Sequence, residues 1–501
     1  MHRGRRVSET VRVELVPLGV SLEVRRGAAL GSVLAAHGLE FPCGGSELCG
    51  CCRVRILEGT LTATPKDKLA LTDEEIAAGW RLACQARAET ALKLHVEQWT
   101  VPILSDHTRL RGSGRSGLGI AIDVGTTTLV AQMVDLTTGD LLGVRTALNP
   151  QTAFGADIMT RLRFALTKPD LTPLIRDAIG DMVRQLAAGR ESEVGEAVLV
   201  GNTVMHHLFA GIDLEPLSHV PFASAELGEQ RFTPRELNWE LPQGCRIRFI
   251  SCIGGFVGSD VLAGIVAVNM STGAELTALI DLGTNGEIAL GNQDRILCAS
   301  TAAGPAFEAG SIRMGMRAAT GAIAQVSNRN GKLECAVIGD VAPRGICGSG
   351  LVDAVAAGLE SGAILPSGRL ANGAREFPVM ESVIVSQADI RELQLAKGAI
   401  AAGVRILLGH WGASMQDVRA VYLAGAFGNY VRVESAARIG LLEMARERVV
   451  SAGNTALRGA KLMLLSENGL MPKIEHVSLA ADAGFQDTFV DCMGFPDAAR
   501  P

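Results

Sequence analysis

Apolar and polar residues alternate in the first part of this 501-residue chain. Val11, Val13 and Leu15 share one face of a predicted strand, and Leu22 and Val24 repeat the pattern, because side chains two residues apart lie on the same face. Further periodic runs predict a helix over 28–37, a strand at 54–56, a helical turn opening at Thr72 and a strand at 92–96. We therefore expect residues 9–97 to form a small α/β domain.

Residues 98–117 lack this periodicity. Arg109, Arg111 and Arg115 alternate there with glycine and serine, and no apolar face emerges. Such a composition is typical of a linker.

A βα-like pattern with a weak internal repeat follows from residue 118. The segment 119–127 (GIAIDVGTT) resembles 279–286 (LIDLGTNG), about 160 residues further on. Each is an apolar strand that ends in Asp-x-Gly-Thr, and each continues into a second β-like run, at 129–134 and 287–290. The repeat predicts two lobes of like fold, over 118–272 and 273–490.

Composition narrows the function classes. Hydrophobic residues make up 48% and charged residues 20%, as in folded proteins, and a net charge of −6 argues against a nucleic-acid partner. We expect no membrane span, because no apolar run approaches about 18 residues. The start of the chain has no apolar targeting core, and four of eleven cysteines fall within ten residues. These features predict a metal or cluster site in a reducing cytoplasm.

The cysteine spacing itself indicates an iron–sulfur cluster. Cys43, Cys49 and Cys52 follow a C-x5-C-x2-C pattern on a glycine-rich loop, and Cys84 stands apart. A remote fourth thiolate is typical of [2Fe–2S] proteins, whose plant-type spacing is C-x4-C-x2-C. The five-residue gap resembles the variant found in mitochondrial and bacterial vertebrate-like ferredoxins.

Two alternatives remain open at this cluster. Zinc sites usually come as two CxxC-like pairs, and the isolated Cys84 argues against zinc without excluding it. Cys51 could be a free thiol or could replace Cys52 as the third ligand. We favour Cys52, because C-x2-C fits the ferredoxin loop and C-x-C does not.

The repeated Asp-x-Gly-Thr turns suit a magnesium–phosphate site. Asp123 and Asp281 would hold Mg²⁺, usually through water, and Gly125 would let phosphate approach the backbone. Thr126 and Thr127 offer further donors. One such turn is a weak signal, but two behind apolar strands are a strong one. A third segment, 420–429 (AVYLAGAFGN), is a strand running into a glycine turn on which adenosine could lie.

Together these segments resemble the phosphate-1, phosphate-2 and adenosine motifs of the acetate kinase/sugar kinase/Hsp70/actin superfamily. Four further phrases carry the match: 201–207 (GNTVMHH), 255–260 (GFVGSD), 300–308 (STAAGPAFE) and 345–350 (GICGSG). With the cysteine domain, the chain from about 9 to 490 resembles the reductive activators of corrinoid proteins.

The resemblance implies a fold and an activity. The fold would be a β-grasp ferredoxin-like domain followed by a duplicated, ribonuclease H-like ATPase fold of the actin/Hsp70 type. The activity would be ATP-dependent transfer of an electron from the [2Fe–2S] cluster to an inactive Co(II) corrinoid protein, restoring Co(I) for methyl transfer. An upstream electron donor would be needed, and a homodimer is left open. Two alternatives are a small-molecule kinase and an ATP-driven electron donor to another metalloenzyme.

The site residues that this reading assigns fall into two groups. The carboxylates that would hold Mg²⁺ or orient water are Asp123, Asp281, Asp260 and Glu308. The residues that would contact ATP are Gly125, Thr126, Thr127, Gly283, Thr284, Asn285, Gly348, Gly425 and Gly428. For Asp260 and Glu308, a capping or salt-bridge role is an equally open alternative.

Other candidates have plainer explanations. His206 and His207 are adjacent, so on a helix they cannot share one ligand face, and we expect one to pack and one to face solvent. The scattered cysteines are expected to be mostly small buried side chains: Cys298, Cys335, Cys347 and Cys492.

Overall fold

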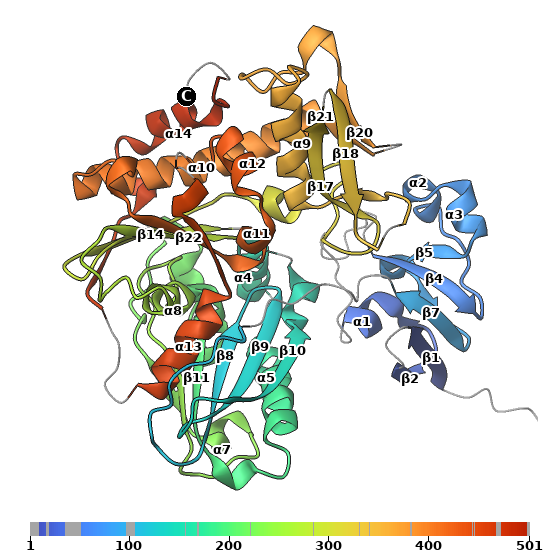
Figure 1. Cartoon of the computed structure of the whole chain (residues 1–501). Helices are drawn as coiled ribbons and strands as arrows, with labels where there is room; N and C mark the ends of the chain where they lie inside the picture. Colours follow the sequence, from blue (N-terminus) through green and yellow to red (C-terminus); the bar gives the residue numbers. More distant parts are fainter. Residues whose placement is uncertain are drawn as a thin grey trace, which may run out of the picture. The chain divides into compact units, whose positions relative to one another are not determined.

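A computed structural model gives the fold of the chain (Figure 1). The residues it describes are 10–16, 20–35, 52–96, 106–155, 157–167, 170–220, 222–283, 285–329, 331–339, 341–380, 383–442, 444, 446–466 and 472–497. Contacts divide the chain into two compact units. The N-terminal unit comprises 1–101 and 148–175, and the main unit comprises 102–147 and 176–501. Among the described residues, no helix is both long enough and apolar enough to cross a bilayer.

The N-terminal unit contains a five-stranded sheet in the order β2-β1-β7-β4-β5. Its strands are β1 (Thr10–Val16), β2 (Val20–Arg25), β4 (Arg53–Glu58), β5 (Trp80–Leu82) and β7 (Leu92–Val96). The alternating residues Val13, Leu15 and Leu94 are fully buried in its core, as the sequence pattern predicts. β1 lies antiparallel to β2 and parallel to β7. Together with the short helix α1 (Leu30–Ala35), this is a β-grasp fold.

The helices of the N-terminal unit are short. They are α1, α2 (Asp67–Ala70), α3 (Asp73–Ala77) and α4 (Ile158–Thr167). The predicted helix over 28–37 begins two residues late, because β3 (Ala28–Ala29) pairs with β6 (Arg87–Ala88). The predicted turn at Thr72 is confirmed: its hydroxyl accepts from the Glu75 N–H, and the Glu75 carboxylate accepts from the Thr72 N–H at 2.8 Å.

Two six-stranded sheets form the main unit. The first has the order β10-β9-β8-β11-β13-β12, and the second has the order β23-β22-β14-β15-β16-β24. The strands of the first are β8 (Leu118–Val124), β9 (Thr128–Asp135), β10 (Leu141–Leu148), β11 (Val194–Gly201), β12 (Gln230–Phe232) and β13 (Arg246–Phe249). Those of the second are β14 (Thr277–Leu282), β15 (Gly286–Gly291), β16 (Ile296–Thr301), β22 (Ala420–Ala424), β23 (Val449–Gly453) and β24 (Ile474–His476).

The two sheets share one topology, which confirms the duplication predicted from the repeat. Numbered along the chain, the first four strands of each lie in the order 3-2-1-4, and a parallel strand then pairs with the fourth, β13 in the first sheet and β23 in the second. β8 runs antiparallel to β9 and parallel to β11, and β14 runs antiparallel to β15 and parallel to β22. Because the carboxyl ends of parallel strands form the ligand-binding edge of such sheets, each Asp-x-Gly-Thr turn lies at a functional edge.

The helices of the main unit cover these sheets and connect them. They are α5 (Thr172–Ala187, which begins in the N-terminal unit), α6 (Thr203–Ala210), α7 (Pro234–Leu237), α8 (Ser259–Ala267), α9 (Gly348–Glu360), α10 (Gln387–Trp411), α11 (Gly425–Tyr430), α12 (Val433–Arg438), α13 (Thr455–Leu465) and α14 (Phe485–Met493). A three-stranded sheet and a hairpin complete the unit: β17 (Ala322–Arg329), β18 (Lys332–Val337), β19 (Gly345–Ile346), β20 (Glu376–Met380) and β21 (Val383–Ser386).

Helices α8 and α13 connect the two lobes. α8 follows β13 of the first sheet and packs on β14 and β15 of the second. α13 follows β23 of the second sheet and packs on β8 and β11 of the first. The helices meet closely at Gly459, where a Cβ atom would lie 1.9 Å from the Ala263 carbonyl oxygen. Glycine is therefore required at this crossing.

Candidate functional site

Each Asp-x-Gly-Thr turn follows the first strand of its lobe, β8 or β14, and contains a short-range backbone hydrogen bond. The Gly125 N–H donates to the Thr128 carbonyl at 3.1 Å, and the Gly283 N–H donates to the Asn285 carbonyl at 3.1 Å. A Cβ atom on Gly125 would lie 2.5 Å from the Thr128 oxygen, so no other residue fits this tight turn. Thr284 lies outside the described residues.

Asp123 and Asp281 occupy equivalent positions in the two lobes. Both are half-buried, and each lies at or next to the last residue of its strand. The pKa of each carboxyl is raised to about 6, by burial for Asp123 and by burial together with the charge of Asp123 for Asp281. The structure thus brings the two predicted carboxylates into electrostatic contact across the two lobes.

Two more carboxylates join this pair. Asp260 lies in the first turn of α8, where burial and the charges of Asp281 and Asp123 raise its pKa to about 7. Glu287 lies on β15 directly opposite Asp281, and burial with the charges of Asp260 and Asp281 raises its pKa well above the ordinary value. Asp260 was predicted from the sequence, but Glu287 was not.

We call these four side chains the carboxylate group: Asp123, Asp260, Asp281 and Glu287. Like charges raise one another's pKa, so the group favours either protons or a bound cation. Within the described part of the chain, no three acidic, histidine or cysteine side chains lie close enough to ligate one metal ion directly.

Glu308 is the remaining carboxylate predicted from the sequence. It is exposed at the end of a 3₁₀ turn, Pro305–Glu308, and it is not among the charges that raise the pKa values of the carboxylate group. Its predicted catalytic role therefore rests on the sequence alone.

Two asparagines hold the first Asp-x-Gly-Thr turn, which contains Asp123 and Thr126. Asn202 caps α6 and donates from Nδ2 to the Thr126 hydroxyl at 2.8 Å. Asn454 caps α13 and donates from Nδ2 to Asp123 Oδ2 at 2.8 Å. Because each side-chain oxygen also accepts from its own helix, both amides are fixed in orientation. Asn454 is 331 residues from Asp123, so no local sequence pattern points to this contact.

The glycine turn after β22 meets the second Asp-x-Gly-Thr turn, which contains Asp281. Ala424 is the register partner of Asp281, and Gly425 follows with φ of 79°. A Cβ atom on Gly425 would lie 2.4 Å from Asp281 Oδ1. Gly428 of α11 packs against Leu423 of β22. Gly348, at the start of α9, lies against the Phe307 carbonyl. The predicted adenosine turn and the predicted phosphate turn are thus in direct contact.

The described cysteines of the cluster motif lie at one end of the β4–β5 pair. Cys52 immediately precedes β4, and Cys84 lies two residues beyond β5, whose Leu82 pairs with Arg53. Their Sγ atoms are 3.3 Å apart, well beyond an S–S bond of about 2.05 Å. Two sulfur ligands about 2.3 Å from one tetrahedral metal ion lie about 3.8 Å apart. The pair is therefore not a disulfide, and its separation is within about 0.5 Å of that of two thiolates on one metal ion. Cys43, Cys49 and Cys51 lie outside the described residues.

The histidine pair has a structural role. Both His206 and His207 are fully buried, so the expectation that one faces solvent is wrong. His207 contacts the Thr203 carbonyl at 2.8 Å and the Ser224 hydroxyl at 2.7 Å. His206 packs edge-on against Phe249. Burial is the main cause that lowers the pKa of His206 to about 4, and the electrostatic effect of the neighbouring His207 lowers it as well. Cys298, Cys347 and Cys492 are buried as expected, and Cys335 is half-buried.

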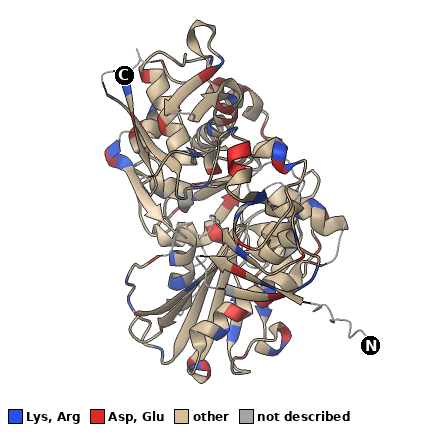
Figure 2. Cartoon of the chain, turned by 90° about the vertical axis from the view of Figure 1, so that its right-hand side faces the viewer, with Lys and Arg blue, Asp and Glu red and all other residues tan. Residues whose placement is uncertain are grey.

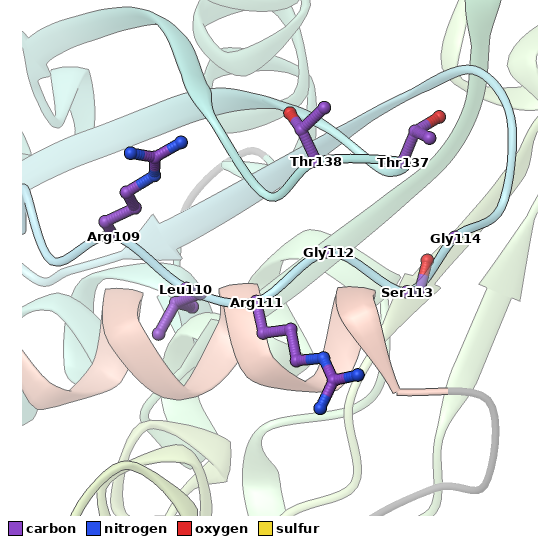
Figure 3. A pocket seen from close by; sticks show the side chains of 8 residues that line it. All are labelled: Arg109, Leu110, Arg111, Gly112, Ser113, Gly114, Thr137 and Thr138. Carbon is purple, nitrogen blue, oxygen red and sulfur yellow. The ribbon is translucent and has the colours of Figure 1, made fainter.

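A cavity of about 630 Å³ lies away from the carboxylate group, where the segment 109–114 crosses the turn at Thr137 and Thr138 (Figure 3). Figure 3 shows Arg109 and Arg111 pointing in opposite directions from this segment. Arg109 is paired with Asp140 at 3.0 Å. The two guanidinium groups therefore do not converge on one anion. Figure 2 shows that Lys and Arg residues and Asp and Glu residues are both distributed over helices, strands and loops of the chain.

Comparisons with known proteins agree with this geometry. Three protein-family models match: a 2Fe-2S iron-sulfur cluster binding domain over residues 13–89, the RACo middle region over 118–273, and the C-terminal domain of RACo, the ASKHA domain, over 275–500.

Individual relatives point the same way. The corrinoid activation enzyme RamQ of Eubacterium limosum is 37% identical over 416 residues, which cover 74% of this chain and 69% of that protein. The [Co(II) methylated amine-specific corrinoid protein] reductase of Methanosarcina barkeri is 27% identical over 414 residues, covering 74% and 76%. The solved reductive activator for corrinoid, iron-sulfur protein is 28% identical, with a TM-score of 0.66 over 97% of this chain and 98% of that one. The chain therefore belongs to the RACo family, the reductive activators of corrinoid proteins.

Proposed function

We propose that this protein is an ATP-dependent reductive activator, which passes one electron to a Co(II) corrinoid protein and returns its cobalt to Co(I). One observation carries the proposal: a single chain holds a ferredoxin-type pair of thiolates, Cys52 and Cys84, and a nucleotide-type carboxylate group at the meeting point of two like-folded lobes. A kinase of the same fold would not need the thiolates.

Four cysteines would hold the cluster: Cys43, Cys49, Cys52 and Cys84. When bound, the [2Fe–2S] cluster supplies a one-electron redox centre. The chain contributes surroundings that tune it. The Gln85 amide donates to Cys84 Sγ at 3.8 Å, and Cys52 is only 2% exposed. Hydrogen bonds to sulfur and exclusion of water are two of the factors that set a cluster's potential.

The carboxylate group would hold Mg²⁺ through water, with the ATP phosphates completing the ion's shell. Gly125, Thr126 and Thr127 would contact phosphate from one lobe, and Gly283, Thr284 and Asn285 from the other. The turn at Gly425 and Gly428 would receive adenosine, with Gly348 nearby. The role of Glu308 in orienting water stays part of this proposal.

The energetic role of ATP follows from the potentials. Plant-type clusters lie near about −400 mV, and each 59 mV by which a one-electron acceptor lies lower disfavours transfer about tenfold. Reduction of a lower-lying cobalt couple therefore needs an energy input. ATP can provide it only by binding the two conformations of the protein with different affinities. Asp123 and Asp281, one in each lobe, are placed to sense the nucleotide from both sides.

The electron donor, the cellular compartment, the domain boundaries and the oligomeric state are also part of the proposal. An upstream electron donor would re-reduce the protein, and the process would take place in the cytoplasm. The domain boundaries 9–97, 98–117, 118–272 and 273–490 and a homodimeric state are likewise open to test.

The direct test mixes the chemically reduced protein with a Co(II) corrinoid protein and follows the Co(I) absorbance with and without Mg-ATP. We expect Co(I) to appear only with ATP, together with release of phosphate. Transfer of the ATP phosphoryl group to a small molecule in the absence of any reductant would instead identify a kinase. No ATP-dependent Co(I) with several corrinoid partners would refute the proposal.

A further inference from the structure

The segment that follows the cluster domain is fixed to a helix of the ATPase fold. The Asp106 carboxylate is 4% exposed, and the Lys461 ammonium that meets it is 2% exposed. Lys461 Nζ lies 2.6 Å from Asp106 Oδ2, and Arg458 Nε lies 3.1 Å from Asp106 Oδ1. Burial alone would raise the pKa of Asp106, but Lys461, Thr108 and Arg458 together hold the pKa below its ordinary value. A charged anchor is therefore embedded in the protein interior.

Further contacts extend the anchor along the helix. Lys461 Nζ also donates to the Asp106 carbonyl at 3.0 Å, and Gln132 Nε2 donates to the same carbonyl at 2.8 Å. Leu110 packs against the apolar cluster that includes residues of α13, and the Arg115 guanidinium donates to the Leu464 carbonyl. Figure 3 shows the segment 109–114 running alongside the pale red helix. The segment 106–115, which we call the anchor segment, thus follows α13 over most of its length.

Close backbone packing secures the other side of the anchor segment. A Cβ atom on Gly112 would lie 2.1 Å from the Thr137 carbonyl oxygen, and one on Gly139 would lie 2.2 Å from the Leu110 carbonyl oxygen. The Ser113 N–H donates to the Leu136 carbonyl at 2.9 Å. The part of the predicted linker that the structure describes is therefore built into the fold.

The same helix reaches the nucleotide site at its other end. Asn454 caps α13 and holds Asp123, while Arg458 and Lys461 follow one and two turns later. α13 also packs tightly on α8, which carries Asp260. A displacement of Asp123 or Asp260 by bound nucleotide therefore acts on the helix that holds the anchor segment.

We propose that Asp106 is a positioning residue for electron transfer: through Lys461 and Arg458 it ties the chain segment from the cluster domain to α13, so that the nucleotide state is transmitted to that segment. The inference rests on the proposed function. It assigns to the anchor segment a role in coupling, whereas the nucleotide chemistry remains with the carboxylate group.

Three variants separate coupling from stability. Asp106→Asn keeps the size of the side chain but leaves Lys461 buried without its counter-charge. The double variant Asp106→Asn with Lys461→Met removes both charges, which often restores the stability that a broken buried pair loses. Asp389→Asn is the matched control, because Asp389 is also a buried carboxylate of the main unit, 1% exposed, and it accepts from the Ser386 N–H in the capping box of α10.

The first readout is the number of Co(I) centres formed per ATP hydrolysed. We expect this ratio to fall at least tenfold in Asp106→Asn, with the cluster spectrum unchanged and ATP hydrolysis within about twofold of the wild type. The double variant should regain its unfolding temperature but not the ratio, and Asp389→Asn should keep the ratio. Recovery of both ratio and stability in the double variant would show a structural role only and overturn the inference, as would a wild-type ratio in Asp106→Asn.

The second readout needs no corrinoid partner. Hydrogen exchange of the backbone amides over 106–115 is compared in the full-length protein with Mg-ADP, with a non-hydrolysable Mg-ATP analogue and without nucleotide. We expect the two nucleotides to give different protection in the wild type and equal protection in Asp106→Asn. Nucleotide-dependent exchange at the start of α13 with none over 106–115 would overturn the inference while leaving the proposed function intact. A lack of response anywhere in the main unit would overturn both.

Discussion

The Cys52 Sγ atom lies 3.3 Å from the Cys84 Sγ atom, although the two residues are 32 positions apart. The antiparallel pairing of Arg53 with Leu82 brings them together, and the Ala83 N–H donates to the Cys52 carbonyl at 2.8 Å. This geometry supports the proposal that Cys52 and Cys84 are both ligands of the cluster.

The first prediction follows from that pair. Cys52→Ser should lose the visible absorbance of the cluster and most of its bound iron, because one iron would lose a thiolate. Cys51→Ser is the control with the same chemical change one position away, and it should keep both signals. Iron content and absorbance of the purified proteins check the outcome, and a reversed result would assign the ligand to Cys51.

The second prediction concerns the turn at Gly425. Gly425→Ala should weaken ATP binding at least tenfold, because the new Cβ atom would press on Asp281 Oδ1 from 2.4 Å away. Gly412→Ala is the matched control: its φ of 81° brings the same left-handed strain of about 1 kcal/mol, but nothing lies within 4 Å of its Cβ position. Nucleotide titrations of the two variants isolate the contact with Asp281. Equal affinities would exclude it as the cause.

The third prediction concerns Glu287. Burial and the charges of Asp260 and Asp281 raise the pKa of Glu287 well above its ordinary value, so the folded protein disfavours the charged carboxylate when no cation is bound. Gln is the neutral isostere of Glu. Glu287→Gln should therefore not lower the unfolding temperature of the nucleotide-free protein, because the variant avoids the cost of burying a carboxyl that is charged in the unfolded chain. With Mg-ATP, the variant should lose most of the stabilisation seen in the wild type, since ligand stabilisation follows affinity. An undiminished Mg-ATP shift would remove Glu287 from the site.

The fourth prediction is a pH dependence from His206. The pKa of His206 is about 4 in the folded protein and about 6.5 in the unfolded chain. As the pH falls, the unfolded chain therefore binds the proton at a higher pH than the folded protein does. Its contribution to stability is complete above pH 6.5 and is lost as the pH falls towards 4, on the order of 3 kcal/mol in total. His206→Gln removes this titration. The free energy of unfolding should fall less steeply between pH 6.5 and 4 in the variant, and parallel curves would refute the assignment.

Much of the fold follows from local sequence patterns. The strand alternation around Val13 and Leu94 and the capping box at Thr72 act within a few residues, so they appear directly in the sequence. The repeated Asp-x-Gly-Thr turns predicted the duplicated sheets, because each turn terminates the first strand of its lobe.

The residues that were missed depend on long-range pairing. Glu287 faces Asp281 across the β14–β15 pair, but the corresponding partner of Asp123 in the first lobe is Val130, so comparison of the repeats does not reveal a carboxylate there. The register of the hairpin could have indicated it. Asn454 is 331 residues from its partner Asp123, and Asp106 is 355 residues from its partner Lys461. Both contacts involve α13. Only the tertiary fold brings them together.

The most direct test of the central claim is a single-turnover experiment. The protein is reduced, freed of excess reductant and mixed with a Co(II) corrinoid protein, while the absorbance of the cluster and of Co(I) is followed together with and without Mg-ATP. We predict that with Mg-ATP the cluster is oxidised and Co(I) is formed with one time constant and one-to-one stoichiometry, and that Asp281→Asn abolishes both changes. Co(I) formation at the same rate without nucleotide, or without oxidation of the cluster, would contradict the account.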